Sequence, residues 1–228
     1  INMRAGALAL EMFKENDNHP GAAHYVIHSF DDPVHAPIAL EAATAYADIA
    51  PAVSHARHMP THIFIQHGMW NEVSLWNDSA FNAGLELWSE GDPTGDMNHS
   101  SDWGQYGDLQ LGDLEKSERW IKRGQMVLDN APSSARAAGT VKTMKARHII
   151  ESKQWKLQPF TDDLDATELL ALGLSAAHLD DLALANQVVA KLDKMLADSP
   201  DNEQLKLIHH EVAAVTLHKE SMQQAMVD

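Results

Sequence analysis

The chain has 228 residues, of which 44% are hydrophobic, so it is long enough and apolar enough to build a buried core. Its 33 acidic and 17 basic residues give a net charge of −16, which argues against a nucleic-acid partner because phosphates need a basic face. No apolar run reaches the ~18 residues of a membrane span, and no secretory leader is visible. We therefore expect a soluble protein, cytoplasmic or periplasmic. The sequence does not indicate how many copies of the chain associate.

Residue usage within the chain is uneven in two respects. Cysteine is absent, which excludes disulfides and thiolate metal sites. Histidine is abundant, with 14 residues in the chain, and many of them fall between His19 and His67. The strong negative charge favours cationic partners or metal ions.

Helix-forming residues dominate the chain from its beginning to its end. Stretches rich in Ala, Leu, Glu and Met predict short helices, and runs typical of β-strands are nearly absent. Turn-forming residues, chiefly Pro, Gly, Asn and Asp, separate these stretches. The breaks fall at residues 16–21, 31–33, 50–51, 68, 91–95, 112–113, 131–132, 158–159 and 199–200. Short helices with short links predict antiparallel helix pairs.

A repeated pattern runs through the predicted helices. Residues 58–80, 106–124 and 170–192 each read as a helix, a turn or close contact at Gly, and a second helix with small residues where the two cross. A weaker copy covers residues 24–39, and Pro159 interrupts the pattern within residues 153–165. The fold prediction is all-α: a tetratricopeptide-repeat (TPR)-like superhelix, a right-handed solenoid of antiparallel helix pairs.

The two ends of the chain look like incomplete repeats. Residues 1–16 resemble a second helix without its first, and the tail from Glu203 resembles a pair that stops early. Bare solenoid ends expose apolar surface and usually need caps. We therefore expect residues 1–228 to form one TPR-like solenoid that belongs to a longer chain, with an irregular segment near 153–165.

Two histidine pairs are placed in register with the repeat. His24 and His28 are four residues apart, as are His58 and His62, so each pair shares one helix face. The second pair follows the first by about 34 residues, the TPR period. The four imidazoles are therefore expected at equivalent positions on neighbouring first helices.

The TPR register extends this face to a predicted ligand groove. TPR proteins bind ligands on the concave surface formed by their first helices, and we expect three consecutive repeats to place polar residues there. The predicted groove residues are His24, His28, Asp31, His55, His58, His62, His99, Asp102 and Tyr106. Trp103 has two alternatives, to face this groove or to fill the core.

Metal binding is one interpretation of this face, because neutral imidazole is a common ligand for Zn, Cu and Ni. The predicted ligands are His24, His28, His58 and His62, and His99 and Asp102 are candidates to complete the site. Carboxylates such as Asp31 would act as ligands or orient the rings. A hydrogen-bonded polar core or groove without metal, and a site for an anionic ligand held by protonated histidines, remain as alternatives.

Pro60 affects the expected positions of these histidines through the residue that precedes it. Proline disfavours the helical conformation at Met59, so His58 is expected to lie in a loop or at a kink. Such a break changes the geometry of the cluster without removing it.

The stretch from His19 to Trp70 carries a specific family resemblance. The motif His-Pro-Gly-Ala-x-His-Tyr-x-Ile-His at residues 19–28, an Ala-Pro turn at 50–51, and His-x-x-His-Met-Pro-x-His-Ile at 55–63 resemble a family of bacterial TPR-containing proteins. Residues 106–113 and 147–155 are similar to later parts of that family. The resemblance implies a TPR-like fold and no established reaction.

Two functions follow as hypotheses. The first is a binding or scaffold module whose histidine-rich groove takes a protein, a peptide or a small ligand, by analogy with the fold. The alternative is a metal-binding protein or metal-dependent enzyme. The chain lacks a zinc-protease His-Glu-x-x-His motif, a Gly-x-Ser-x-Gly motif and a phosphate-binding loop, so we assign no catalytic residue and favour a non-enzymatic role.

Overall fold

The computed structural model describes residues 3–227, and within them every regular element is an α-helix. No strand occurs in this part of the chain, which confirms the all-α prediction. No helix within the described residues has both the length and the apolar character that a membrane crossing requires.

The chain divides into two compact units, Ile1–Val141 and Lys142–Asp228, with the boundary inside α9 (Ala135–Ser152). The helices of the first unit that precede α9 are α1 (Met3–Glu15), α2 (Pro20–Ser29), α3 (Ala36–Ile49), α4 (Ser54–His58), α5 (Pro60–Gln66), α6 (Trp70–Leu87), α7 (Gly95–Gln110) and α8 (Leu114–Asn130). Those of the second unit after α9 are α10 (Ala166–His178), α11 (Leu182–Asp198) and α12 (Glu203–Val227). We describe each unit separately.

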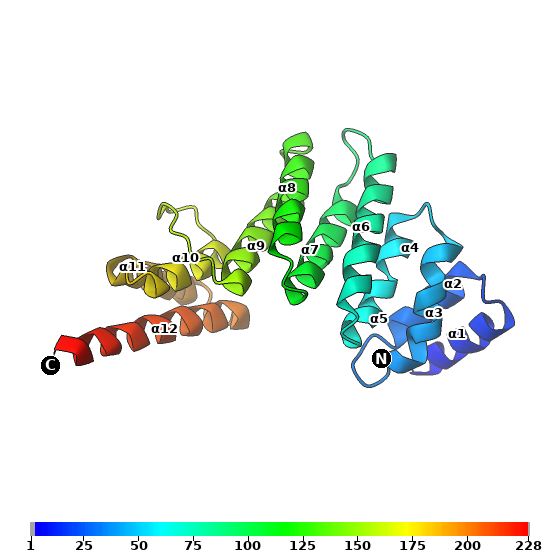
Figure 1. The fold of residues 1–228 in the computed structure, drawn as a ribbon, viewed down its shortest axis with the longest axis horizontal. Helices are drawn as coiled ribbons and strands as arrows, with labels where there is room; N and C mark the ends of the chain where they lie inside the picture. The colour runs from blue at the N-terminus through cyan, green and yellow to red at the C-terminus, as the bar shows by residue number, and fades with distance from the viewer. Residues whose placement is uncertain (1–2, 228) are drawn as a thin grey trace. The chain divides into compact units, whose positions relative to one another are not determined.

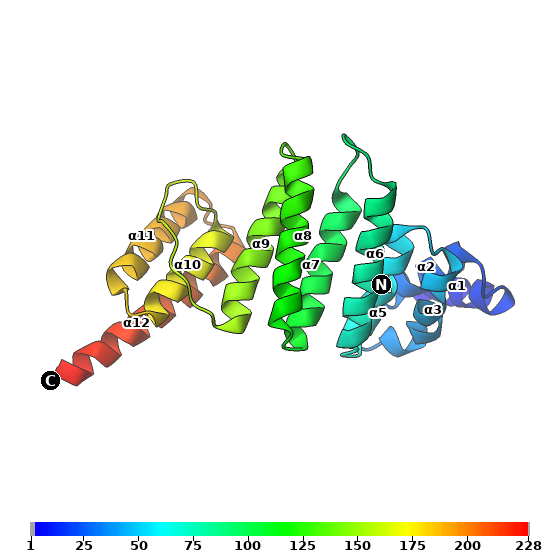
Figure 2. The same ribbon diagram turned by 45° about the horizontal axis from the view of Figure 1, so that its top comes forward.

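Consecutive helices pack against each other in both units. In the first unit α1 contacts α2, α2 contacts α3, and α6, α7 and α8 form a row of neighbours (Figures 1 and 2). Helices one step further apart also touch, such as α3 with α5 and α4 with α6. In the second unit α10, α11 and α12 all contact one another.

Local sequence signals explain where several helices begin. His19 caps α2, its Nδ1 accepting a hydrogen bond from the Ala22 amide at 3.1 Å, and Pro20 follows in the first turn. Asp165 caps α10 in a reciprocal arrangement with Glu168. Between Lys153 and Asp165 the chain forms no helix, as expected for the segment that contains Pro159.

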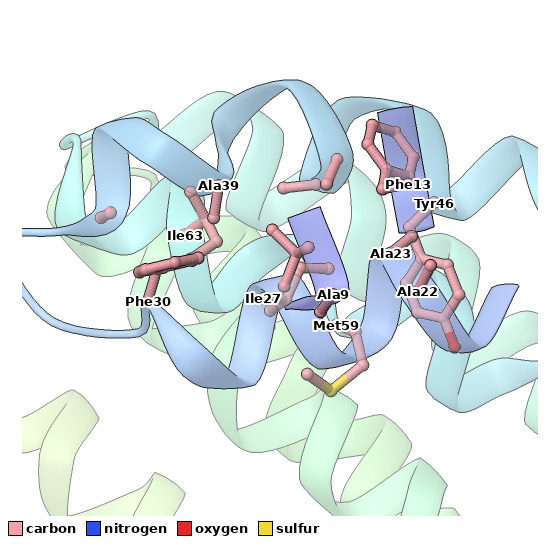
Figure 3. Close-up of a cluster of buried hydrophobic side chains, with 14 of the residues drawn as sticks. Ala9, Phe13, Ala22, Ala23, Ile27, Phe30, Ala39, Tyr46, Met59 and Ile63 are labelled. Atoms are coloured by element: carbon pink, nitrogen blue, oxygen red, sulfur yellow. The ribbon is translucent and has the colours of Figure 1, made fainter. Parts of the chain in front are cut away.

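The largest apolar cluster of the first unit lies around α1, α2, α3 and α5. Figure 3 shows Phe30 beside Ile63 and Ala39, and Phe13 beside Tyr46, within the same cluster of buried side chains. Ala23, Ala39 and Ile27 have no exposed surface. Alanine at such positions lets helix backbones approach closely, and this close approach brings α2 and α5 into contact.

A buried polar contact joins α6, α7 and α8. The carboxylate of Asp108, 1% exposed, accepts hydrogen bonds from Ser74 Oγ at 2.6 Å and Trp120 Nε1 at 2.7 Å. Lys116 Nζ lies 3.8 Å from the same carboxylate and supplies a compensating charge. The indole of Trp120 reaches Asp108 because Gly104 has no side chain: a Cβ there would lie 2.7 Å from Trp120 Cε2.

Gly104→Ala should therefore destabilise the protein despite the higher helix propensity of alanine. The new methyl group would displace the buried indole, and overpacking of this kind costs about 1–3 kcal/mol. Denaturant unfolding measures the change in the free energy of unfolding.

Gly139→Ala is the matched control, because that glycine also lies inside a helix and a Cβ there meets nothing within 4 Å. We expect it to stabilise by about 0.5–1 kcal/mol. Equal effects of the two substitutions would contradict the close packing assigned to Gly104.

Candidate metal centre

Four short stretches of the first unit bring six histidines together. Helix α2 carries His24 and His28, α4 carries His55 and His58, α5 carries His62, and α7 carries His99. Contacts of α2 with α5 and of α4 with α7 hold these helices near one another. The six imidazoles form two groups of three, and within each group one ligand-capable nitrogen per residue lies within 4.8 Å of the others. We call His58, His62 and His99 the inner triad, and His24, His28 and His55 the outer triad.

Pro60 marks a break between two helices, but His58 lies inside α4 and not in the loop that the sequence allowed. Helix α4 ends at His58 and α5 begins at Pro60. Met59 between them nevertheless has helical angles, φ −53° and ψ −38°, so the chain direction is kept across the break. His58 and His62 consequently stay on one side, with their Nε2 atoms 3.2 Å apart.

Hydrogen bonds fix the orientation of both rings in this pair. His58 Nδ1 lies 2.7 Å from Asn77 Oδ1, and Asn77 Nδ2 donates to the carbonyl of Val73 at 2.8 Å, which leaves the amide oxygen as the acceptor. His58 therefore carries its proton on Nδ1. His62 Nδ1 donates to the carboxylate of Asp31 at 2.8 Å, and Gln66 Nε2 donates to the other carboxylate oxygen at 3.2 Å. In both rings Nε2 is directed toward the other ring.

Trp103 forms an aromatic wall against the inner triad. Its ring centroid lies 4.5 Å from that of His62, 5.1 Å from His58 and 5.6 Å from His99. Of its two alternatives, the structure therefore places Trp103 beside the histidines. His58 is only 2% exposed, whereas His62 and His99 are partly buried.

The outer triad is more open and has one comparable short contact. His24 Nε2 lies 3.2 Å from His55 Nε2, and the ring of His24 stacks on the buried Tyr46 at 5.7 Å. His28 is solvent-exposed, and its ring centroid lies 4.6 Å from that of His24. In the outer triad, His24 is therefore packed against other side chains, whereas His28 is in contact with water.

Burial keeps several of these imidazoles neutral. Burial lowers the pKa of His58 to about 3, with the neighbouring His99 and His62 acting in the same direction against the hydrogen bond to Asn77. Burial and the charge of His28 lower the pKa of His24 to about 4. Although His28 reaches solvent, partial loss of hydration also lowers its pKa, and burial lowers that of His99. Neutral rings offer a nitrogen lone pair, which is the form that metals bind.

Asp31 remains ionised beside these rings. Burial opposes its ionisation, but the hydrogen bonds from His62 and Gln66 outweigh it, and the pKa of Asp31 is lowered. The carboxylate therefore acts as an acceptor for His62 Nδ1. This arrangement is a carboxylate that orients a histidine, the second of the two roles the sequence offered for Asp31.

The structure brings only some of the predicted site residues together. The four predicted metal ligands do not form one group: His58 and His62 join His99, whereas His24 and His28 join His55. Asp102 lies close enough to His99 to affect its pKa, and it raises that pKa against the effect of burial. Tyr106 packs edge-on against Trp70 at 5.7 Å and belongs to neither triad.

Other histidines of the same region have local structural roles. His19 caps α2, His35 Nδ1 lies 2.9 Å from the carboxylate of Asp32, and His67 Nδ1 lies 2.8 Å from the carbonyl of Ile63. Asn77, the partner of His58, is not among the residues predicted for the site. Its position 19 residues away on another helix gives no local signal.

Comparisons with known protein families, with curated proteins and with solved structures found no match to this chain.

The metal-free protein should lose stability as the pH falls below about 6.5. An unfolded histidine takes up a proton near that pH, whereas folded His58 resists protonation until about pH 3. The depressed pKa thus supports folding above pH 6.5, and this contribution is lost as the pH falls toward 3. For His58 alone the loss between pH 7 and 5 is about 2 kcal/mol.

Urea unfolding at pH 7 and pH 5, in the presence of a chelator, measures this loss. His58→Gln should reduce the difference between the two pH values, whereas His210→Gln, at an exposed position of α12, should leave it as in the unmodified protein. An unchanged pH dependence in His58→Gln would rule out a neutral buried imidazole at residue 58.

Proposed function

We propose that this protein binds a divalent transition-metal ion through the inner triad. The observation that carries the proposal is the 3.2 Å separation of His58 Nε2 and His62 Nε2. Both rings have their Nδ1 engaged with an acceptor, Asn77 in one case and Asp31 in the other. Two unprotonated Nε2 atoms would direct lone pairs at each other, so this arrangement requires a cation between them.

A proton or a metal ion can satisfy that requirement, and the third histidine favours the metal. A shared proton needs only two nitrogens, whereas the inner triad gathers three within 4.8 Å. Metal–nitrogen bonds of about 2.0–2.1 Å at a tetrahedral angle separate two ligand nitrogens by about 3.3 Å. The measured separation of 3.2 Å fits this value. Trp103 and the surrounding helices exclude much of the competing water.

The donor set narrows the choice of ion. The triad consists of imidazoles and the chain has no cysteine, so zinc, copper and nickel are the ions we propose. Three protein ligands leave a coordination position open, which is typical of catalytic rather than structural zinc sites. Asp31, Asp102 and the net charge of −16 favour the presence of a dication. We propose no reaction for the site.

We further propose that the helices that carry the site form a TPR-like solenoid, as the family resemblance implies. Contacts between consecutive helices and a glycine at a close crossing support it: a Cβ at Gly107 of α7 would lie 2.8 Å from Val73 Cγ1 of α6. In this proposal the ligand of the histidine-rich face is a metal ion. Binding of a protein, peptide or small ligand there stays a prediction.

Zinc should bind the purified, chelator-treated protein and stabilise it. A ligand at 100 times its Kd adds about 2.7 kcal/mol to the free energy of unfolding, which thermal unfolding detects. His99→Gln should weaken zinc binding by at least ~100-fold, because it removes one of the three ligands. Loss of a residue that only orients a ligand has a smaller effect. Isothermal titration calorimetry at pH 7 gives the affinities.

His210→Gln controls for general histidine binding, because this exposed residue lies outside both triads. It should bind zinc as tightly as the unmodified protein. Equal affinities for the unmodified protein and the His99→Gln variant would refute the inner triad as the site.

Asp31→Asn should lower the zinc affinity by about 10–100-fold without removing a ligand. An amide oxygen can still accept from His62 Nδ1, but the negative charge that makes the imidazole a stronger donor is lost. Asp32→Asn is the matched control, because that adjacent carboxylate pairs with His35 outside the triads. If both variants weakened zinc binding equally, Asp31 would not be an orienting residue.

A further inference from the structure

The outer triad repeats the feature that identifies the inner one. His24 Nε2 and His55 Nε2 lie 3.2 Å apart, the same separation as in the pair of the inner triad. The third member, His28, brings a ligand-capable nitrogen within 4.8 Å of both. The outer triad therefore has the donor number and the spacing of a second three-histidine site.

The two triads share a boundary. The ring centroids of His28 and His62 lie 6.1 Å apart, one from each triad. Asp31 contacts His62 through a hydrogen bond at 2.8 Å and is close enough to His28 for each to affect the other's pKa. A carboxylate thus lies at the junction, where it offsets part of the repulsion between two dications.

The triads differ in exposure, and this difference sets the order in which they would fill. The inner triad contains the buried His58 and has rings oriented by Asn77 and Asp31. The outer triad has its exposed edge at His28. Preorganised ligands out of water hold an ion more tightly than ligands that water can reach.

We propose that the two triads form a two-ion centre, in which a tightly held divalent ion in the inner triad is accompanied by a second, more exchangeable ion in the outer triad. This inference rests on the proposed metal binding by the inner triad. The chemical class of the second ligand is the same: a first-row divalent cation that prefers nitrogen donors.

Cobalt(II) and copper(II) titrations of the full chain test the proposal. Equilibrium dialysis against cobalt(II), with metal and protein quantified, should give two ions per chain in the unmodified protein. The double variant His24→Gln/His28→Gln should bind one ion with nearly unchanged first affinity. The double variant His58→Gln/His99→Gln should lose the tighter event.

A histidine pair in α12 of the second unit provides the matched control. His209→Gln/His210→Gln changes two adjacent histidines outside both triads, so it should still bind two ions. Circular dichroism of every variant establishes that the helices are formed. Loss of one ion in this control would show that the second ion binds elsewhere, and it would overturn the two-ion proposal.

Two further readouts locate the ions. Copper(II) bound in the inner triad should quench Trp103 fluorescence in the first binding event, and Trp103→Phe should remove that part of the quenching. With two copper(II) ions bound, electron paramagnetic resonance should detect magnetic coupling between them. Two ions without coupling would contradict a shared centre.

The possible outcomes separate this inference from the function on which it rests. One ion per chain, lost in His58→Gln/His99→Gln, would refute the two-ion centre and leave the inner site intact. No binding of cobalt(II), copper(II) or zinc to the unmodified protein would refute both. Two ions in His24→Gln/His28→Gln would place the second ion outside the outer triad and overturn the inference.

Discussion

The approach of His58 and His62 is the constraint around which the histidine-rich region is built. Each ring is held on its Nδ1 side by an acceptor from another part of the chain: Asn77 of α6 for His58, and Asp31, in the segment between α2 and α3, for His62. With their Nδ1 atoms engaged, the rings can only direct Nε2 inward. The 3.2 Å contact between those atoms therefore follows from the hydrogen bonds that Asn77 and Asp31 make to the two rings.

Burial of these rings opposes stability under acidic conditions and favours metal binding at neutral pH. A buried imidazole resists protonation because the low-dielectric interior penalises charge, as at His58 and His24. The same effect leaves a lone pair available at neutral pH without the need to displace a proton. Histidines that resist protonation are thus well suited to bind a metal ion.

The sequence predicted the elements of this region better than their assembly. Helical patterning and breaks at Pro and Gly indicated an all-α chain, and the confirmed helices follow those signals. Histidines four residues apart correctly mark shared helix faces, because that relation is local. The division into two triads depends on how α2, α4, α5 and α7 cross, which is set by close packing at residues such as Ala23 and Ala39. The contact of Asn77 with His58 and the pairing of His24 with His55 depend on how the helices pack. No local sequence pattern therefore predicts them.

Helix α4 is five residues long and supplies one imidazole to each triad, His55 to the outer and His58 to the inner. Such a short helix has no room to bend between the two positions, so a rotation that adjusts one ring moves the other with it. In the proposed two-ion centre, occupancy of the two triads would consequently be coupled in free energy, and by linkage each ion would alter the affinity of the other by the same factor. Under this proposal the length of a single helix, α4, would set how strongly an ion in one triad affects the binding of an ion in the other.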